Sequence, residues 1–178
     1  MQKSASRPCS RTRSRQFSRG RVAALFCFME RTAVTASTKV SGRAPLAALR
    51  RFARQAHRAA GVRGEVCILL ATDAEIQRLN RKFRGQDRAT DVLSFPAARG
   101  GDIAISTAKA QAQARRHGHA TGEEIKILIL HGMLHLAGYD HERDNGRMAR
   151  REERLRRQLR LPAGLISRGD NARSRSKP

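Results

Sequence analysis

Residues 121–141, TGEEIKILILHGMLHLAGYDH, constrain the fold of this chain more than any other segment. Their recurring apolar side chains predict a helix, and Thr121 followed by Glu124 forms a capping-box signature at its start. The helix is strongly apolar, so we expect it to lie buried at the centre of the domain. It also carries His131 and His135, and a dry surround would fix these side chains and strengthen their electrostatic interactions.

His131, His135 and His141 have the spacing of a catalytic zinc site. Two histidines four residues apart on a helix lie on the same face, one turn apart. Gly138 can adopt the left-handed conformation that ends a helix, and the chain then turns back to the third histidine. Three protein ligands leave one zinc position open to water, as in catalytic sites, whereas structural sites are generally closed by four ligands. We therefore expect one Zn²⁺ ion per chain at these side chains.

The three histidines also match the long zinc-protease motif, H-E-x-x-H-x-x-G-x-x-H, at every position except the second. Gly132 stands where those enzymes have the Glu that activates the attacking water. The missing general base argues against a protease of this kind and favours a different hydrolysis.

Around the central helix, the sequence predicts a single α+β domain with a small mixed β-sheet and further helices. Buried or alternating apolar runs predict strands at 65–71, 90–95 and 101–106, and part of 32–40 is compatible with an edge strand. Amphipathic patterns and caps predict helices at 45–60, from Thr72 through Phe83, from Ser106 or Thr107 to Gly118, and from Asp144 as N-cap to Arg160.

The domain is expected to span residues 45–160, between a basic, disordered extension at 1–44 and a disordered basic tail at 161–178. Residues 1–45 contain ten Lys or Arg and one acidic residue, without a sustained apolar period, and cannot form a core alone. They resemble a transit peptide, a basic arm that touches RNA, or a segment upstream of a true start at Met29. We favour the last two, because nothing else in the chain points to an organelle, and expect a cytoplasmic protein.

The charge of the chain favours a polyanionic partner. Lys and Arg total 37 against 15 Asp and Glu, and residues 46–160 alone hold 23 basic and 13 acidic residues, a net charge of +10. Nucleic acid is the commonest partner for such a field, although Arg-rich surfaces also follow from the composition of some genomes. Aromatic residues near the motifs are few, so recognition would depend on backbone charge and RNA shape rather than base stacking.

The cysteines and the hydropathy exclude other classes. Cys9, Cys27 and Cys67 are odd in number and lack C-x-x-C spacing, which argues against a disulfide framework and a cysteine metal site. No apolar run approaches membrane-spanning length, so we expect no membrane association.

A second group of polar residues lies in the segment 79–96, LNRKFRGQDRATDVLSFP. Together with GDIAIS and HGMLHLAGYDH, in this order, it makes the chain resemble the YbeY family of rRNA maturation factors over roughly 62–160. The resemblance implies a zinc-dependent endoribonuclease, specific for single strands, that acts on rRNA and ribosomal particles. Its implied roles are maturation of the small-subunit rRNA 3′ end and ribosome quality control, and we expect a monomer.

The resemblance also assigns residues. The family's metal ligands fall on His131, His135 and His141, and its important arginine falls on Arg84 in the KFRG stretch. Zinc would lower the pKa of a bound water that attacks a phosphodiester, while the Arg84 guanidinium clamps the phosphate. Without the resemblance, Arg84 would be an ordinary solvated residue at a helix end.

Three further residues are candidates for supporting the site. Asp91 and Ser94 match positions in the TDVLSFP string. Asp91 either orients Arg84 or satisfies backbone donors at the start of a strand. Asp140 either orients a ligand imidazole or caps a turn.

Two rival functions stay open. One is a ribosome-assembly factor that binds RNA and holds zinc without catalysis. The other is a metal-dependent hydrolase of a small phosphoester or amide, for which the large positive charge has no evident use.

Overall fold

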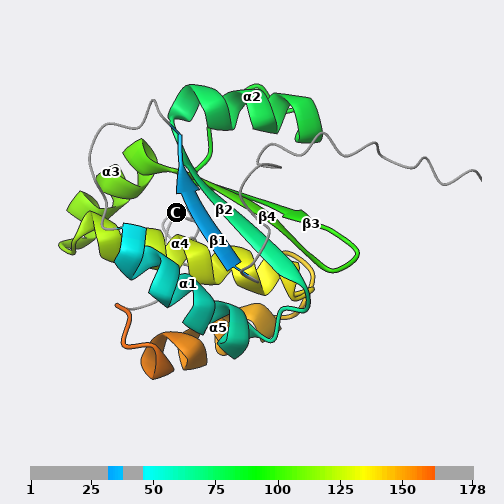
Figure 1. The fold of residues 1–178 in the computed structure, drawn as a ribbon, viewed down its shortest axis with the longest axis vertical. Helices are drawn as coiled ribbons and strands as arrows, with labels where there is room; N and C mark the ends of the chain where they lie inside the picture. Colours follow the sequence, from blue (N-terminus) through cyan, green and yellow to red (C-terminus); the bar gives the residue numbers. More distant parts are fainter. Residues whose placement is uncertain (1–31, 38–45, 163–178) are drawn as a thin grey trace, which may run out of the picture.

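The computed structural model describes residues 32–37 and 46–162 (Figure 1). The elements in chain order are β1 (Thr32–Ala36), α1 (Leu46–Ala60), β2 (Glu65–Ala71), α2 (Asp73–Arg84), β3 (Val92–Pro96), β4 (Gly100–Ser106), α3 (Thr107–His117), α4 (Thr121–Leu136) and α5 (Arg147–Gln158). Four strands and five helices in one unit confirm the predicted α+β domain. No helix among these residues is both long and apolar enough to cross a bilayer.

The sheet is mixed, as predicted, with strand order β1-β2-β4-β3. β1, β2 and β4 run parallel, and β3 pairs antiparallel with β4 through a short hairpin. Val34 lies beside Ile68, Ile68 beside Ile103, and Ile103 beside Ser94. Side chains in register across neighbouring strands share one face of a sheet, so these four residues point to the same side.

Helices cover both faces of the sheet (Figure 1). α1 and α4 pack on the face that carries Ile68 and Ile103, and together they enclose the main core. α2 covers part of the opposite face, where Ile76 packs with Leu93 and Ala104 in a smaller cluster. α5 packs against α4 on the side away from the strands (Figure 1).

α4 is the central helix, as predicted. Every residue from Ile127 to Leu134 is buried, including His131. Burial of each large apolar side chain contributes roughly 1.5–3 kcal/mol, so this helix supplies much of the hydrophobic stabilisation. The ligand-bearing helix is therefore held by the core itself.

Gly132 permits a close approach of α4 to the sheet. A Cβ atom at this position would lie 2.9 Å from Cγ2 of Ile103 and 3.0 Å from its Cδ1. The position of the missing protease Glu thus faces β4 at close range. The glycine leaves room for the Ile103 side chain, and a larger residue at position 132 would force that side chain or the helix to shift.

Two helix starts differ from the sequence prediction. The first residue of α4 is Thr121, with Ala120 as N-cap, and Glu123 rather than Glu124 accepts the Ala120 N–H (3.2 Å). Glu124 is buried and pairs with His119 instead. The predicted Thr121–Glu124 capping box is therefore wrong by one residue. The Glu124 side chain is buried in the fold, whereas a capping box would place it at the exposed start of the helix.

The last helix is shorter than the predicted 144–160. Asn145 (φ 52°) and Gly146 (φ 77°) adopt left-handed conformations, which cannot continue a right-handed helix, so α5 begins at Arg147. Asp144 accepts the N–H of Met148 (2.7 Å) from the turn before the helix and is not its N-cap. Arg160 (φ 54°) ends the helical run at the other end.

β1 corrects the N-terminal boundary. Thr32–Ala36 pairs with β2 along its whole length, with Val34 buried in the main core. Because this strand belongs to the domain, the expected extension at 1–44 is too long at its C-terminal end. The expected disorder of 1–31, 38–44 and 163–178 falls outside the described residues, as do Cys9 and Cys27. Cys67 forms no disulfide within the described part of the chain.

Candidate metal centre

His131 and His135 stand side by side at the C-terminal end of α4. Their Nε2 atoms are 3.2 Å apart, as expected for residues one turn apart on one helix face. His131 is buried, and His135 is half-buried. The helix backbone and the surrounding core therefore fix both rings.

A tight turn brings His141 to the same point. Gly138 has φ 90°, and Tyr139 donates its N–H to the Leu134 carbonyl (3.0 Å), so the chain reverses directly after α4. The His141 ring centroid lies 5.4 Å from that of His131 and 5.3 Å from that of His135. One ligand nitrogen from each of the three residues lies within 4.8 Å of the others. His141 is exposed, so the cluster opens to solvent on its side.

The hydrogen bonds of the two helical histidines define their tautomers. Nδ1 of His135 lies 3.0 Å from the Tyr139 carbonyl oxygen, which can only accept, so this nitrogen donates. Nδ1 of His131 lies 3.0 Å from Oε2 of Glu152, a carboxylate, and donates likewise. In the neutral rings both Nε2 atoms then carry lone pairs.

Two facing lone pairs 3.2 Å apart repel unless a positive charge lies between them. A tetrahedral zinc ion with nitrogen ligands at about 2.0–2.1 Å needs those nitrogens roughly 3.4 Å apart, close to the observed separation. Hydrogen bonds from Nδ1 to a carboxylate or a carbonyl are the usual support for metal-binding histidines. The donor set and its support thus fit a metal ion held by His131, His135 and His141.

Burial keeps His135 neutral. Desolvation, followed by the charges of the neighbouring His131 and His141, lowers the pKa of this imidazole from 6.5 to about 4. The Tyr139 carbonyl and the charge of Asp140 act in the opposite direction but are weaker. At neutral pH, protons therefore do not compete for the Nε2 lone pair of His135.

Glu152 and Arg156 form a buried ion pair behind His131. Both side chains are 2% exposed, and Oε1 of Glu152 accepts from Nε of Arg156 at 2.8 Å and lies 2.6 Å from its Nη2. Burial alone would raise the pKa of Glu152, but the His131 hydrogen bond and the charges of His131 and Arg156 outweigh it and hold the pKa below 4.5. Arg156 Nη1 also donates to the Pro162 carbonyl (2.8 Å), which fixes the far end of the pair.

Sequence reasoning missed Glu152. The sequence feature that could have identified it is its position. It is an acidic residue on the inward side of the last helix, between Met148 and Leu155, which are both buried. A carboxylate at a core position needs a partner. An Arg four residues later and a histidine ligand elsewhere were the candidates, and Glu152 binds both.

Arg84 lies at the C-terminal end of α2, exposed to solvent. Its Nη2 donates to the backbone carbonyl of Ser94 on β3 (3.2 Å). Ser94 is paired with Ile103, which packs on Gly132, the neighbour of His131. Arg84 is thus anchored to the strand that lies beside the histidine-bearing part of α4.

Ser94 itself is buried at 7% exposure. Because it is in register with Ile103, its side chain lies on the face of the sheet that α4 covers. The structure therefore places Ser94 on the side of the histidine cluster, with its carbonyl bound to Arg84.

Asp91 and Asp140 have structural partners. The Asp91 carboxylate accepts from Thr90 Oγ1 (3.0 Å), the Val92 N–H (2.9 Å) and Gln113 Nε2 (2.9 Å), so it ties the start of β3 to α3. Its position is three residues before Ser94, roughly 10 Å along the strand. The structure therefore supports the satisfaction of local donors and not the orientation of Arg84.

Asp140 caps the turn that leads to His141. Its Oδ1 accepts the N–H of Glu142 (3.1 Å), and its carbonyl accepts the N–H of Arg143 (3.1 Å). No hydrogen bond from Asp140 to a ligand imidazole occurs among the described residues. Of the two roles left open by the sequence, the structure supports the turn cap, with an electrostatic effect on His135.

Fold and site together define a class: a single-domain α+β protein whose buried helix presents a cluster of three histidines that can hold a metal ion and that opens to solvent. The model of the family described as Endoribonuclease YbeY matches residues 33–160, which is most of the chain and begins within β1. The chain belongs to the YbeY family.

Two individual relatives carry the same family name. The chain is 54% identical over 120 residues to Endoribonuclease YbeY of Koribacter versatilis, covering 66% of this chain and 79% of that protein. It is 53% identical over 123 residues to Endoribonuclease YbeY of Solibacter usitatus, covering 68% and 84%. It also aligns with a solution structure of a protein from Thermotoga maritima, with a TM-score of 0.47, 25% identity, and coverage of 83% of this chain and 99% of that chain.

Proposed function

We propose that this protein is a zinc-dependent endoribonuclease that cuts single-stranded rRNA. The observation that carries the proposal is the pair of Nε2 lone pairs of His131 and His135, 3.2 Å apart and each held by a hydrogen bond from Nδ1. The names of the relatives support an RNA substrate, and the net positive charge of the chain suits a polyanion.

The chain's own residues would act as holders and positioners. His131, His135 and His141 would bind the zinc ion, and Glu152 would fix the ring of His131. When bound, zinc supplies Lewis acidity that lowers the pKa of a coordinated water and provides a nucleophile at neutral pH. Such a reaction needs no carboxylate at position 132, which agrees with the packing of Gly132 against Ile103.

Arg84 would bind the phosphate of the RNA. Within the described residues the guanidinium makes one hydrogen bond, from Nη2 to the Ser94 carbonyl. The second Nη2 hydrogen remains, together with its neighbour on Nε or Nη1, for two phosphate oxygens. A guanidinium fork binds phosphate in two-point geometry and stabilises the charge that develops during phosphoryl transfer. The bond to Ser94 would hold this fork at the edge of β3.

The biological setting belongs to the same proposal. We infer that the substrates are rRNA and ribosomal particles, in maturation of the small-subunit rRNA 3′ end and in ribosome quality control. We further infer a cytoplasmic monomer. The support is the family resemblance of the three motifs together with the basic charge of the domain.

Cleavage by purified, nuclease-free protein tests the proposal. The zinc-loaded protein should cut an rRNA fragment, and H131A and R84E should lose cutting while R116Q, an exposed arginine on α3, keeps it. Zinc content is measured in parallel. If the wild type binds zinc and RNA without turnover, the protein is a non-catalytic assembly factor. If H131A and R84E cut like the wild type, the assignment of these residues is wrong.

A further inference from the structure

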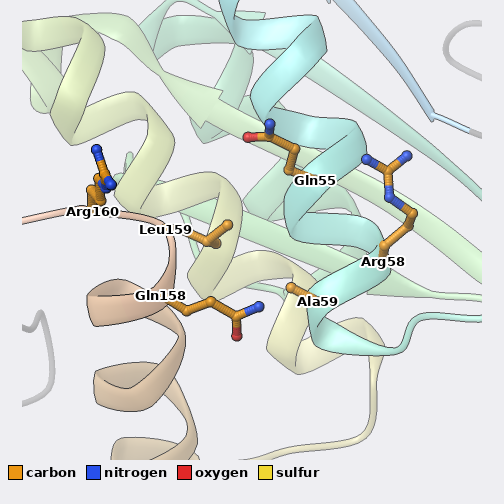
Figure 2. A pocket seen from close by; sticks show the side chains of 6 residues that line it. All are labelled: Gln55, Arg58, Ala59, Gln158, Leu159 and Arg160. Carbon is orange, nitrogen blue, oxygen red and sulfur yellow. The ribbon is translucent and has the colours of Figure 1, made fainter.

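A groove of about 590 Å³ lies between α1 and the C-terminal end of α5 (Figure 2). Its lining residues are Gln55, Arg58 and Ala59 from α1 and Gln158, Leu159 and Arg160 from the end of α5. None of the three histidines contributes to it. It is a feature separate from the metal centre, and the cleavage chemistry does not use it.

The side chains of this groove select for an anion. Arg58 and Arg160 stand on opposite sides of it, and two carboxamides, from Gln55 and Gln158, add neutral hydrogen-bond donors (Figure 2). No carboxylate lines the groove. Both arginines are exposed, so each can pair with a ligand without first breaking a buried contact.

Among the described residues of α1 and α5, no acid is left to pair with these arginines. α1 contains no Asp or Glu at all. The two acids of α5 are already paired, Glu152 with Arg156 and Glu153 with Arg157. The positive charge of the groove is therefore available to an external partner.

The backbone holds the end of the groove in place. Arg160 has φ 54° and donates its N–H to the Arg157 carbonyl (3.2 Å). The next residue, Leu161, donates to the Arg156 carbonyl (2.9 Å), and the Arg156 side chain holds Pro162 (2.8 Å). The chain after α5 is thus fixed by three hydrogen bonds around Arg160.

A basic stripe on α5 runs from the groove toward the start of the helix, and the same helix contacts the histidine cluster through Glu152 and His131. Arg147, Arg151, Arg154 and Gln158 follow one another at intervals of four, three and four residues, so they share one side of the helix. Arg151 Nη2 donates to the Ala59 carbonyl on α1 (2.9 Å), which shows that this side faces the groove. The stripe extends about 16 Å along the helix, and its first residue, Arg147, follows the exposed His141 by a few positions in the sequence.

We propose that the groove between α1 and α5 binds the phosphate backbone of the substrate RNA away from the bond that is cut. The inference rests on the proposed function, because it takes RNA as the ligand of the metal centre. One continuous RNA strand would contact the metal centre, the groove and the basic stripe. A short acidic protein segment would not contact all three. The groove has no aromatic side chain, so it binds backbone charge and not bases.

The test compares two double variants of equal charge. R58Q/R160Q alters the groove, and R115Q/R116Q alters two exposed arginines at the end of α3 as a matched control. Affinity is measured by fluorescence anisotropy on zinc-loaded protein in the cold, with single-stranded RNAs of about 60 and about 10 nucleotides, over a series of salt concentrations.

The groove variant should bind the long RNA about tenfold more weakly, and its slope of log K against log salt should shrink by about 1.4, or 0.7 for each lost phosphate contact. Binding and cleavage of the short RNA should stay at the wild-type level, and the control should change neither RNA. If R58Q/R160Q does not fold, Q55E/Q158E, which adds negative charge to the same groove, should give the same loss.

Three results would overturn the proposal. The groove variant could match the control on the long RNA, or it could weaken the short and long RNAs equally. It could also keep the long RNA but lose binding of poly-glutamate, in which case the groove serves an acidic protein segment. Because binding is measured without cleavage, absence of turnover in every protein would refute the proposed function and leave the groove result standing.

Discussion

Glu152 accepts a hydrogen bond from Nδ1 of His131 at 3.0 Å, across 21 positions of sequence and between two different helices. The contact fixes which nitrogen of His131 carries the proton and directs the other toward the histidine cluster. Arg156 in turn holds the carboxylate, so a buried chain of three charged or polar groups ends at the metal centre. The buried Glu152–Arg156 pair therefore belongs to the core and also determines which nitrogen of His131 is available to a metal ion.

Replacing Glu152 by Gln should weaken zinc binding by about 10–100-fold, because the amide accepts less strongly and no longer carries charge. The same change removes one partner of a buried pair and should destabilise the fold by about 3–5 kcal/mol. Zinc affinity is measured by competition with a chromogenic chelator, and stability by urea unfolding. E153Q, next to it on the exposed side, is the control and should change neither. Wild-type zinc affinity in E152Q would contradict a role in positioning His131.

Gly132→Ala should destabilise the protein by about 1–3 kcal/mol, because the new methyl overlaps Ile103 on β4 at 2.9 Å. Gly122→Ala is the matched control on the same helix, since a Cβ there meets nothing within 4 Å. The control should be neutral or stabilising by up to about 1 kcal/mol, because alanine favours a helix. Adding I103A to G132A should recover part of the loss in a double-mutant cycle. Equal stabilities of G132A and G122A would refute the close approach of α4 to the sheet.

Acid should destabilise the metal-free protein through His135. The pKa of this residue is about 4 in the folded protein against 6.5 ordinarily. Between these values the unfolded chain binds a proton that the folded chain excludes, so stability falls as the pH drops. Glu152 acts only below its ordinary pKa of 4.5 and does not enter the range from 6.5 to 5.

The measurement is the thermal midpoint of wild type and H135Q with chelator present, from about pH 7 to about pH 5. The wild type should lose stability relative to H135Q on acidification, because glutamine has no proton to bind. A constant difference between the two proteins over this range would show that His135 is not held neutral by the fold.

Arg84→Lys should lower the rate of RNA cleavage by about 10²-fold while zinc content stays at the wild-type level. Lysine keeps the charge but lacks the planar fork that can bind the Ser94 carbonyl and a phosphate together. R81K on the same helix, where Arg81 only faces Asp87 at 3.7 Å on the surface, is the control and should cut normally. If R84K cuts as fast as R81K, the charge of Arg84 suffices and its geometry does not matter.

Local sequence patterns predicted helices and strands correctly where apolar residues of the pattern are buried in the fold. The apolar run at 65–71 is strand β2, and the apolar helix with His131 is the centre of the core. Predictions failed where a side chain had a tertiary alternative. Glu124 was expected to cap a helix but is buried against His119, and the run expected to start at Asp144 is interrupted by left-handed residues before Arg147.

The sequence by itself determined that His131, His135 and His141 meet, because helical periodicity and the glycine turn operate within a few residues of the chain. Only the tertiary structure decided what surrounds them. The docking of α5 on α4 brings Glu152 to Nδ1 of His131, the hairpin places Ser94 under Arg84, and the pairing of Asp91 with Gln113 takes Asp91 out of the site. These contacts depend on how elements pack across long separations, and no local periodicity encodes the partner of a buried polar group.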